Sequence, residues 1–355
     1  MLSQDSSGGC NPGIMRLRAH TGRAGTIGAG PKKQTFKGFS IIESELERVR
    51  RLIGEQVSDC SGPVRGLADY VNSHCGKMLR PGLVLLSGAA CGKITQAHIR
   101  VAAIIEMIHN ATLLHDDVVD DGKSRRGFTT VNCLKGNESA VLLGDFLLSR
   151  VFKMCVGLDG QADKVIASAA CRTCEGELMQ VLERGNWRIS ETEYIEIIAD
   201  KSAALFSSAC RLGASLAGGG NAEVWSLAEY GRNTGIAFQI VDDLLDITGD
   251  ENDMGKTLGR DADKDKITLP LIHLLSSTNK QGKREVIELL SGRRTGKHYK
   301  AALKRKLNQH GSIEYANNRA KKLVEKAIGA IGKIKQSAAS EALIETAEFV
   351  VRRTV

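Results

Sequence analysis

Residues 101–127 read VAAIIEMIHNATLLHDDVVDDGKSRRG, an apolar run that ends in two pairs of aspartates and a basic loop. The apolar residues are dense and no Gly or Pro interrupts them before the aspartates, so the stretch predicts a buried helix. On that helix Asp116 and Asp120 are four residues apart and lie on one face, one turn from each other. Burying such a stripe of carboxylates is costly unless a cation neutralises it. The stretch therefore predicts a metal-binding face on a core helix.

The alternative for these aspartates is a solvated helix end. Two features disfavour it: aspartate at the C-terminus of a helix opposes the macrodipole, and the neighbouring positions are too apolar for an exposed helix. His109 and Thr112 continue the same stripe towards the N-terminus. Carboxylate ligands suit a hard cation such as Mg²⁺.

A second stretch, residues 231–250, repeats this pattern as GRNTGIAFQIVDDLLDITGD. The polar residues that share one helical face here are Gln239, Asp242, Asp243 and Asp246. Each aspartate cluster is followed by basic residues, first Arg125 and Arg126, then Lys256 and Lys266. Opposed carboxylates with a basic rim predict a site where Mg²⁺ bridges to a polyphosphate. No Gly-rich phosphate loop of the nucleotide-binding kinds is present.

The composition is that of a mainly helical protein with a large core. The chain has 355 residues, of which 42% are apolar and 4% aromatic, with only 5 Pro. No run of 18 uncharged apolar residues occurs, so no transmembrane helix and no stable membrane insertion are expected. The net charge of +8 is concentrated at the two ends, in residues 1–37 and 279–355, and leaves an acidic middle. This distribution does not predict a nucleic-acid partner.

The cysteines and the first 37 residues bear on the cellular compartment. Nine cysteines, an odd number, lie mostly in apolar helical patterns, which favours reduced thiols and a cytoplasmic location. Residues 1–37 are rich in Gly, Ser and Arg and lack hydrophobic periodicity, which predicts a disordered basic tail. An organellar import signal is the alternative for this segment.

Together these motifs resemble the trans-prenyltransferases, the polyprenyl diphosphate synthases, over about residues 40–355. DDVVD at 116–120 with RRG at 125–127 resembles the family's first aspartate-rich motif, and FQIVDDLLD at 238–246 resembles the second. GKMLRP at 76–81 resembles the segment that binds isopentenyl diphosphate. GDFLLSR at 144–150 and KITLPL at 266–271 also match.

The resemblance implies a role for each group of residues. The diphosphate of isopentenyl diphosphate would be bound by Lys77, Arg80, His109 and Arg126. Magnesium ions would be bound by Asp116, Asp120 and Asp242, with Asp243 and Asp246 beside them. The diphosphate of the allylic substrate would be bound by Arg125, Lys201, Ser202, Gln239, Lys256 and Lys266. The catalytic set would be Asp116, Asp120, Asp242 and Lys201.

The implied fold is all-α, a single large helical bundle around a central cavity, with residues 38–355 as the catalytic domain. The implied activity is Mg²⁺-dependent condensation of an allylic prenyl diphosphate with isopentenyl diphosphate, repeated to a medium or long all-trans chain such as a quinone side chain, with release of diphosphate. The implied assembly is a homodimer.

Three alternatives remain open. A synthase of the shorter, geranylgeranyl type would share every motif. A non-catalytic prenyltransferase subunit should have lost one aspartate motif, and both are intact here. A terpene cyclase would not need the basic residues at Lys77, Arg80 and His109.

Two residues depart from the family pattern, and two others bear on product length. Ser202 stands where Thr is usual, which keeps the hydroxyl group. Asp265 stands where Gly is usual, so the loop before Lys266 is expected to be more restricted. Ala111 and Thr112, just before the first motif, are small, and in this family small residues there imply a longer product.

Overall fold

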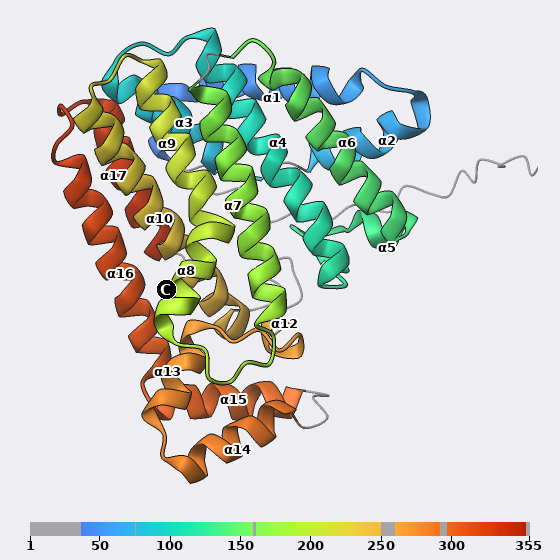
Figure 1. Cartoon of the computed structure of the whole chain (residues 1–355), viewed down its shortest axis with the longest axis vertical. Coiled ribbons are helices and arrows are strands. Elements are labelled where there is room, and N and C mark those ends of the chain that lie inside the picture. Colours follow the sequence, from blue (N-terminus) through green and yellow to red (C-terminus); the bar gives the residue numbers. More distant parts are fainter. Residues whose placement is uncertain (1–36, 75, 159–160, 250–259, 292–296, 353–355) are drawn as a thin grey trace, which may run out of the picture. The chain divides into compact units, whose positions relative to one another are not determined.

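The computed structural model describes residues 37–74, 76–158, 161–249, 260–291 and 297–352. These residues form a helical assembly, and the strands among them are the two short ones of a single hairpin (Figure 1). The prediction of an all-α fold is thus confirmed. The predicted tail lies outside the described residues except for Lys37.

The elements follow one another along the chain as follows. The first part contains η1 (Lys37–Ile42), α1 (Glu43–Ser58), α2 (Gly62–Ser73), α3 (Leu79–Cys91), α4 (Gln96–Val119), β1 (Ser124–Arg125), β2 (Phe128–Thr129), α5 (Val131–Lys135), α6 (Asn137–Cys155) and α7 (Ala162–Leu182). The second part contains α8 (Glu191–Ile198), the π-helical turn η2 (Ala199–Ala203), α9 (Ala204–Leu216), α10 (Asn221–Thr248), α12 (Arg260–Asp263), α13 (Leu269–Ser277), α14 (Lys280–Ser291), α15 (Lys297–Gln309), α16 (Ser312–Ile331) and α17 (Ala338–Arg352).

Helix α4 is a core helix, as its apolar sequence predicts. It packs against α1, α3, α6 and α9, and its residues from Val101 to Ile108 are all buried. A capping box formed by Thr95 and His98 starts the helix, because each side chain bonds the backbone N–H of the other residue. The same His98 ring reaches the carbonyl of Gly213 on α9 at 3.0 Å. These contacts fix the N-terminal end of α4, and the first aspartate motif lies at its C-terminal end.

Helix α10 carries the second motif and is packed unusually closely against α9. A Cβ on Gly231 would lie 2.5 Å from the Phe206 carbonyl oxygen, and a Cβ on Gly235 would lie 2.7 Å from the Cα of Ala203. Only glycine permits these approaches. Helix α9 also contacts α3, α4 and α7, so it joins the helices that carry the two aspartate motifs.

The RRG sequence after the first motif forms the turn of the β1–β2 hairpin. Ser124 pairs with Thr129 and Arg125 with Phe128, which leaves Arg126 and Gly127 as a two-residue loop. Both loop residues have positive φ, 56° and 82°, as a type I′ turn requires. Tyr70 of α2 donates a hydrogen bond of 2.7 Å to the Thr129 carbonyl and so anchors the hairpin.

No helix in the described ranges is both long and apolar enough to cross a membrane.

Candidate active site

The last residue of the first motif, Asp120, is held by two cations. Its Oδ2 accepts a hydrogen bond from the Lys266 ammonium at 2.6 Å, and its Oδ1 accepts one from Arg184 Nη2 at 2.8 Å. Burial alone would raise the pKa of Asp120, but the charges of Lys266, Lys201 and Arg184 outweigh it, and the net pKa is lowered. Asp120 is therefore kept ionised, and its contact with Lys266 joins the two motif regions.

Asp116 lies one turn earlier, half-buried on the same face of α4. No described residue donates a hydrogen bond of normal length to its carboxylate. Its charge raises the pKa of Lys201 and of Glu177, which places it close to both. Of the first motif, Asp116 is thus the carboxylate most available to a ligand within the described part of the chain.

Asp117, between these two, has a structural role. It is buried and accepts three contacts from Arg125, with N···O distances of 2.8, 3.0 and 3.1 Å. Burial lowers the pKa of Arg125, but Asp117, Asp116 and Asp242 together raise it overall. The guanidinium of Arg125 therefore lies among carboxylates of both motifs, which is direct support for their convergence.

In the second motif, Asp243 has both oxygens in hydrogen bonds. Tyr194 donates its hydroxyl to Oδ2 at 2.6 Å, and Gln239 donates its amide to Oδ1 at 2.8 Å. Burial, followed by the charges of Asp261 and Asp242, raises the pKa of Asp243 to about 7. This carboxylate orients Gln239 and Tyr194 and does not project freely towards the first motif.

The other two aspartates of the motif differ in exposure. Asp246 is buried and accepts the backbone N–H of Asp261 at 3.2 Å, which ties α10 to α12. Asp242 is only half-buried, and its charge acts on Arg125 of the opposite motif. Asp242 is therefore the member of the second motif best placed to act with Asp116.

Lys201 and Ser202 lie in η2, and π-helical turns often occur at functional sites. Lys201 donates to Glu177 Oε2 at 2.7 Å and to Gln180 Oε1 at 2.8 Å. Burial lowers its pKa, but Asp116, Glu177 and Asp120 raise it overall, so the ammonium stays charged. Ser202 donates its hydroxyl to Gln239 Oε1 at 2.6 Å.

The loop after the second motif brings Lys266 to the site. Its ammonium also lies 3.6 Å from Asp261, and its backbone N–H bonds the Asp261 carbonyl at 2.9 Å. Asp265 has φ of 58°, in the left-handed region, which explains why glycine is usual at this position. Lys256 lies outside the described residues.

Arg125 also belongs to a basic cluster with Arg80, His109 and Arg126. Burial lowers the pKa of Arg80 to about 10, with Glu106 opposing this shift and Arg126 adding to it. Burial also lowers the pKa of His109, and the charges of Arg80, Arg126 and Arg125 lower it further. The positive charges of these groups disfavour protonation of one another. Arg80 Nε is buried with no hydrogen-bond partner among the described residues. The cluster is thus suited to an anion with several acceptor oxygens.

The segment GKMLRP supplies the remaining cations of this cluster. Arg126 donates to the His74 carbonyl at 3.0 Å, and a Cβ on Gly76 would lie 2.4 Å from its guanidinium, so a larger residue at Gly76 would displace the Arg126 side chain. The Lys77 ammonium is 4.8 Å from the centre of the Phe349 ring, on α17. Of the four residues predicted to bind one diphosphate, Arg80, His109 and Arg126 act on one another, and Lys77 lies next in sequence to Gly76, which contacts Arg126.

The donor set of the two motifs fits a hard divalent cation. Across the residues that the structure describes, no three carboxylate, imidazole or thiol groups converge closely enough to hold a metal ion. Asp120 is bonded to Lys266 and Arg184 instead. The ligands offered are nevertheless all carboxylate oxygens, the type that Mg²⁺ prefers. Of these, Asp116 and Asp242 are the ones with exposed surface beside Arg125.

The two positions predicted to set product length differ in their surroundings. Ala111 is fully buried and lies one turn before His115, whose ring contacts the Val141 carbonyl on α6 at 3.2 Å. Ala111 therefore faces α6. Thr112 is half-buried, and its hydroxyl bonds the His109 carbonyl at 2.8 Å.

Three residues of this site were not predicted from the sequence. Arg184 contacts Asp120, Tyr194 contacts Asp243, and Phe349 lies against Lys77. Each belongs to an element distant in sequence from its partner, and no local pattern marks it.

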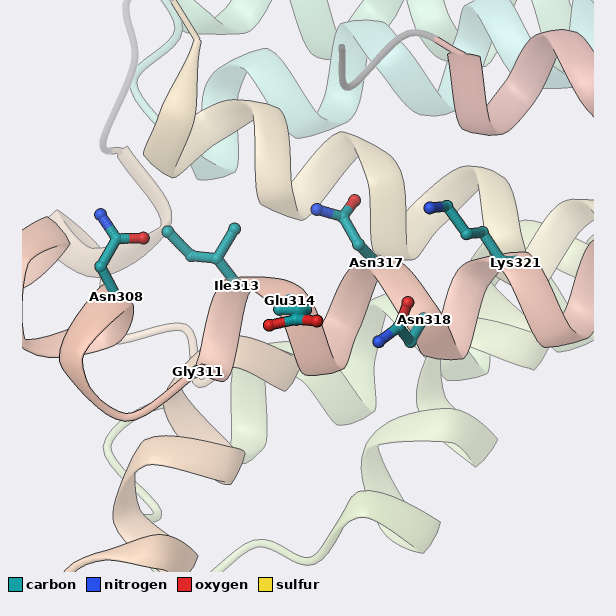
Figure 2. A pocket seen from close by; sticks show the side chains of 7 residues that line it. All are labelled: Asn308, Gly311, Ile313, Glu314, Asn317, Asn318 and Lys321. Carbon is teal, nitrogen blue, oxygen red and sulfur yellow. The ribbon is translucent and has the colours of Figure 1, made fainter.

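A hollow of about 330 Å³ lies elsewhere, where α15 meets α16 (Figure 2). Its lining is formed by Asn308, Gly311, Ile313, Glu314, Asn317, Asn318 and Lys321. None of the predicted site residues lines it.

Comparison with known proteins identifies the family of this chain. The family model for Polyprenyl synthetase matches residues 63–306. Octaprenyl diphosphate synthase of Escherichia coli (strain K12) is 36% identical over 315 residues, covering 88% of this chain and 97% of that enzyme. A short chain isoprenyl diphosphate synthase of Methanothermobacter thermautotrophicus is 33% identical over 321 residues, covering 89% and 98%. The crystal structure of a polyprenyl synthase from Caulobacter crescentus CB15, complexed with calcium and isoprenyl diphosphate, has a TM-score of 0.86 at 31% identity, covering 92% and 100%.

Proposed function

Because the chain belongs to the polyprenyl synthetase family, a family of transferases, we propose that it elongates an allylic prenyl diphosphate with isopentenyl diphosphate and repeats this step. The product is a medium or long all-trans polyprenyl diphosphate, of the kind that supplies a quinone side chain. Diphosphate is released at each addition.

One observation carries this proposal: Arg125 interacts with an acidic set of residues and with a basic set. The carboxylates of Asp116 and Asp242 act on the charge of Arg125, and the charges of Arg125, Arg80 and Arg126 act together on His109. A reaction that joins two diphosphate substrates needs two such neighbouring sites, one for each anion. The short distance between them would hold the two substrates in position to react.

The first site would ionise the allylic substrate. Asp116, Asp120 and Asp242 would hold Mg²⁺, which neutralises the charge that develops on the departing diphosphate. Lys201 stays charged in spite of burial, and with Lys266 it would bind diphosphate oxygens directly. Gln239 is oriented by Asp243 and Ser202, so its position does not depend on the substrate.

The second site would orient isopentenyl diphosphate. Arg80 is preorganised against the Phe206 ring, 4.8 Å from its centre, and Arg126 is fixed by the hairpin turn. His109 has a lowered pKa and would donate or accept as a neutral ring. The double bond of this substrate attacks the allylic carbon, and the proton then lost passes to the released diphosphate. No protein nucleophile is required.

The assay that tests this function incubates the full chain with Mg²⁺, farnesyl diphosphate and labelled isopentenyl diphosphate and separates the products by length. Several additions to each primer are expected. A single addition would instead favour a geranylgeranyl-type synthase. The absence of any extension would overturn the proposed reaction and favour a non-catalytic subunit or a cyclase.

Lys77→Ala is expected to raise the KM for isopentenyl diphosphate by about 10-fold or more and to change the KM for the allylic substrate little. Loss of one charge-assisted hydrogen bond of about 1.5–3 kcal/mol accounts for this factor. Steady-state kinetics with each substrate varied in turn measures both constants. Lys93→Ala, an exposed lysine just beyond α3, is the matched control. Equal increases in both constants would show that Lys77 does not belong to one diphosphate site.

We propose that the size of the residues at Ala111 and Thr112 determines product length. Ala111→Tyr should therefore shorten the main product while condensation continues. A ring at this position would fill space between α4 and α6 one turn before the metal-binding face. Chromatography of the products measures chain length, and thermal unfolding checks for overpacking. Thr112→Tyr is the companion variant, since Thr112 faces the site. An active Ala111→Tyr variant with products of unchanged length would contradict the role of Ala111.

We propose a homodimer as the working assembly. Helix α6 exposes the large apolar side chains Leu142 and Phe152, and Val156 follows directly after it, with exposed fractions of 66%, 70% and 75%. The spacing of Leu142 and Phe152 places them near one face of the helix, and such a patch usually marks a protein interface. Sedimentation of the wild type against Phe152→Asp tests this, and a monomeric wild type would contradict it.

We also propose that residues 38–355 are the catalytic domain and that the enzyme acts in the cytoplasm. Phe39 is buried against Gly82 of α3, so this residue already belongs to the helical unit. A variant that begins at Phe36 should keep its condensation activity. Loss of the fold in that variant would show that the preceding segment is structural.

A further inference from the structure

Arg184, in the turn that follows α7, is a second cation on the first aspartate motif. Its Nη2 donates to Asp120 Oδ1 at 2.8 Å, while Lys266 donates to Oδ2 at 2.6 Å. One carboxylate thus faces two full positive charges. Other carboxylates nearby are already engaged, since Glu177 pairs with Lys201 and Asp261 lies against Lys266. Arg184 is therefore paired with a carboxylate that it shares with a second cation.

On one edge of the Arg184 guanidinium, only one of the two N–H donors has an acceptor among the described residues. Nε–H and one Nη2–H point in the same direction and form the fork that binds carboxylates and phosphates with two parallel hydrogen bonds. Here Nη2 is bonded to Asp120, whereas Nε is buried and has no acceptor among the described residues. A buried donor left without a partner is destabilising, and a ligand oxygen would relieve this. The open position of the fork lies next to the Asp120 carboxylate.

The turn that carries Arg184 is tied to the loop that carries Lys266. Gly185 donates its backbone N–H to the Asp265 carbonyl at 2.9 Å. Gly185 has φ of 74° and Asp265 has φ of 58°, so both sides of this contact are in the left-handed region. The two cations that flank Asp120 are therefore presented by two loops that are bonded to each other.

We infer that Arg184 is a ligand of the allylic diphosphate, which would accept the free Nε–H and share the guanidinium with Asp120. This inference rests on the proposed function, because it requires that an allylic diphosphate binds beside the first motif. A diphosphate offers several acceptor oxygens, one of which would accept the Nε–H that has no acceptor among the described residues. Arg184 would thus act together with Lys266 on the same anion.

The test measures binding without turnover. Titration calorimetry of the full chain with farnesyl thiolodiphosphate and Mg²⁺ gives the Kd of an allylic analogue that ionises very slowly. Arg184→Ala is expected to weaken this Kd by about 10- to 100-fold, the range for loss of a charged hydrogen bond. The Kd for isopentenyl diphosphate should stay within about twofold of the wild type. Arg188→Ala, an exposed arginine on the same turn, is the matched control and should bind both ligands normally.

The remaining outcomes separate this inference from its premise. A wild type that does not bind the analogue overturns the proposed function and this inference with it. A wild type that binds the analogue and an Arg184→Ala variant that binds it equally well overturn the inference alone, even if kcat falls, because Arg184 would then only hold Asp120. Arg184→Gln keeps most of the side chain and should retain the wild-type melting temperature while losing allylic affinity. If its melting temperature and both affinities fall together, the role is structural and the inference is wrong.

Discussion

Asp116→Ala and Asp242→Ala are each expected to lower kcat by at least about 10³-fold, with much smaller changes in KM. Each substitution removes a carboxylate that would hold Mg²⁺ where charge develops on the leaving diphosphate, and such interactions act mainly on the transition state. Neither side chain is deeply buried, so the fold should survive the change. Steady-state kinetics at saturating Mg²⁺ gives kcat, and thermal unfolding verifies the fold.

Asp69→Ala, an exposed aspartate on α2, is the control and should behave as the wild type. Asp117→Ala makes a useful contrast within the same motif. Its loss frees Arg125 from three contacts and should lower stability as well as kcat. Near-normal rates for Asp116→Ala or Asp242→Ala would show that the stripe on these helices is not the metal site.

The sequence was sufficient to predict the two motif helices because their apolar residues define buried faces over several turns. Helix α4 ends at Val119 and α10 ends at Thr248, so both end at their aspartates, as the pattern indicates. The family resemblance then predicted that the two motifs lie at one site. The ion pair between Asp120 and Lys266, 146 residues apart, joins the first motif to the loop that follows the second.

What the sequence could not predict is which aspartate of each motif is committed to a structural partner. Asp117 is adjacent to Asp116, yet it is paired with Arg125. Asp243 is adjacent to Asp242, yet it is bonded to Tyr194 and Gln239. Helical spacing gives the direction of a side chain, whereas its partner depends on how distant helices pack. Arg184 was not predicted for the same reason, because its contact with Asp120 spans 64 residues of sequence.

Asp265 is a position where the sequence raised the question of a restricted loop without answering it. In the structure Asp265 has φ of 58°, in the left-handed region. Aspartate tolerates this region better than most residues, because its short side chain can bond to the local backbone. The loop therefore still delivers Lys266 to Asp120 at the cost of a modest conformational strain.

Gly176→Ala is expected to lower kcat by about 10²-fold and the free energy of unfolding by about 1–3 kcal/mol. A Cβ at this position would lie 2.2 Å from the backbone N of Lys201 and 2.7 Å from its Cα. These are backbone atoms that cannot rotate away, so η2 would have to move. Because the π-helical turn presents both Lys201 and Ser202, a shift of even about 1 Å would misplace the ammonium and the hydroxyl that orients Gln239.

Kinetics and thermal unfolding on one preparation measure both effects of Gly176→Ala. Gly329→Ala is the matched control. Gly329 is helical, as Gly176 is, but it is exposed, and a Cβ there would meet nothing within 4 Å. That variant should gain about 0.5–1 kcal/mol from the higher helix propensity of alanine and keep full activity. A Gly176→Ala variant with wild-type kcat and melting temperature would mean that η2 can shift freely. The rigid placement of Lys201 against α7, on which its role at the allylic diphosphate depends, would then be untenable.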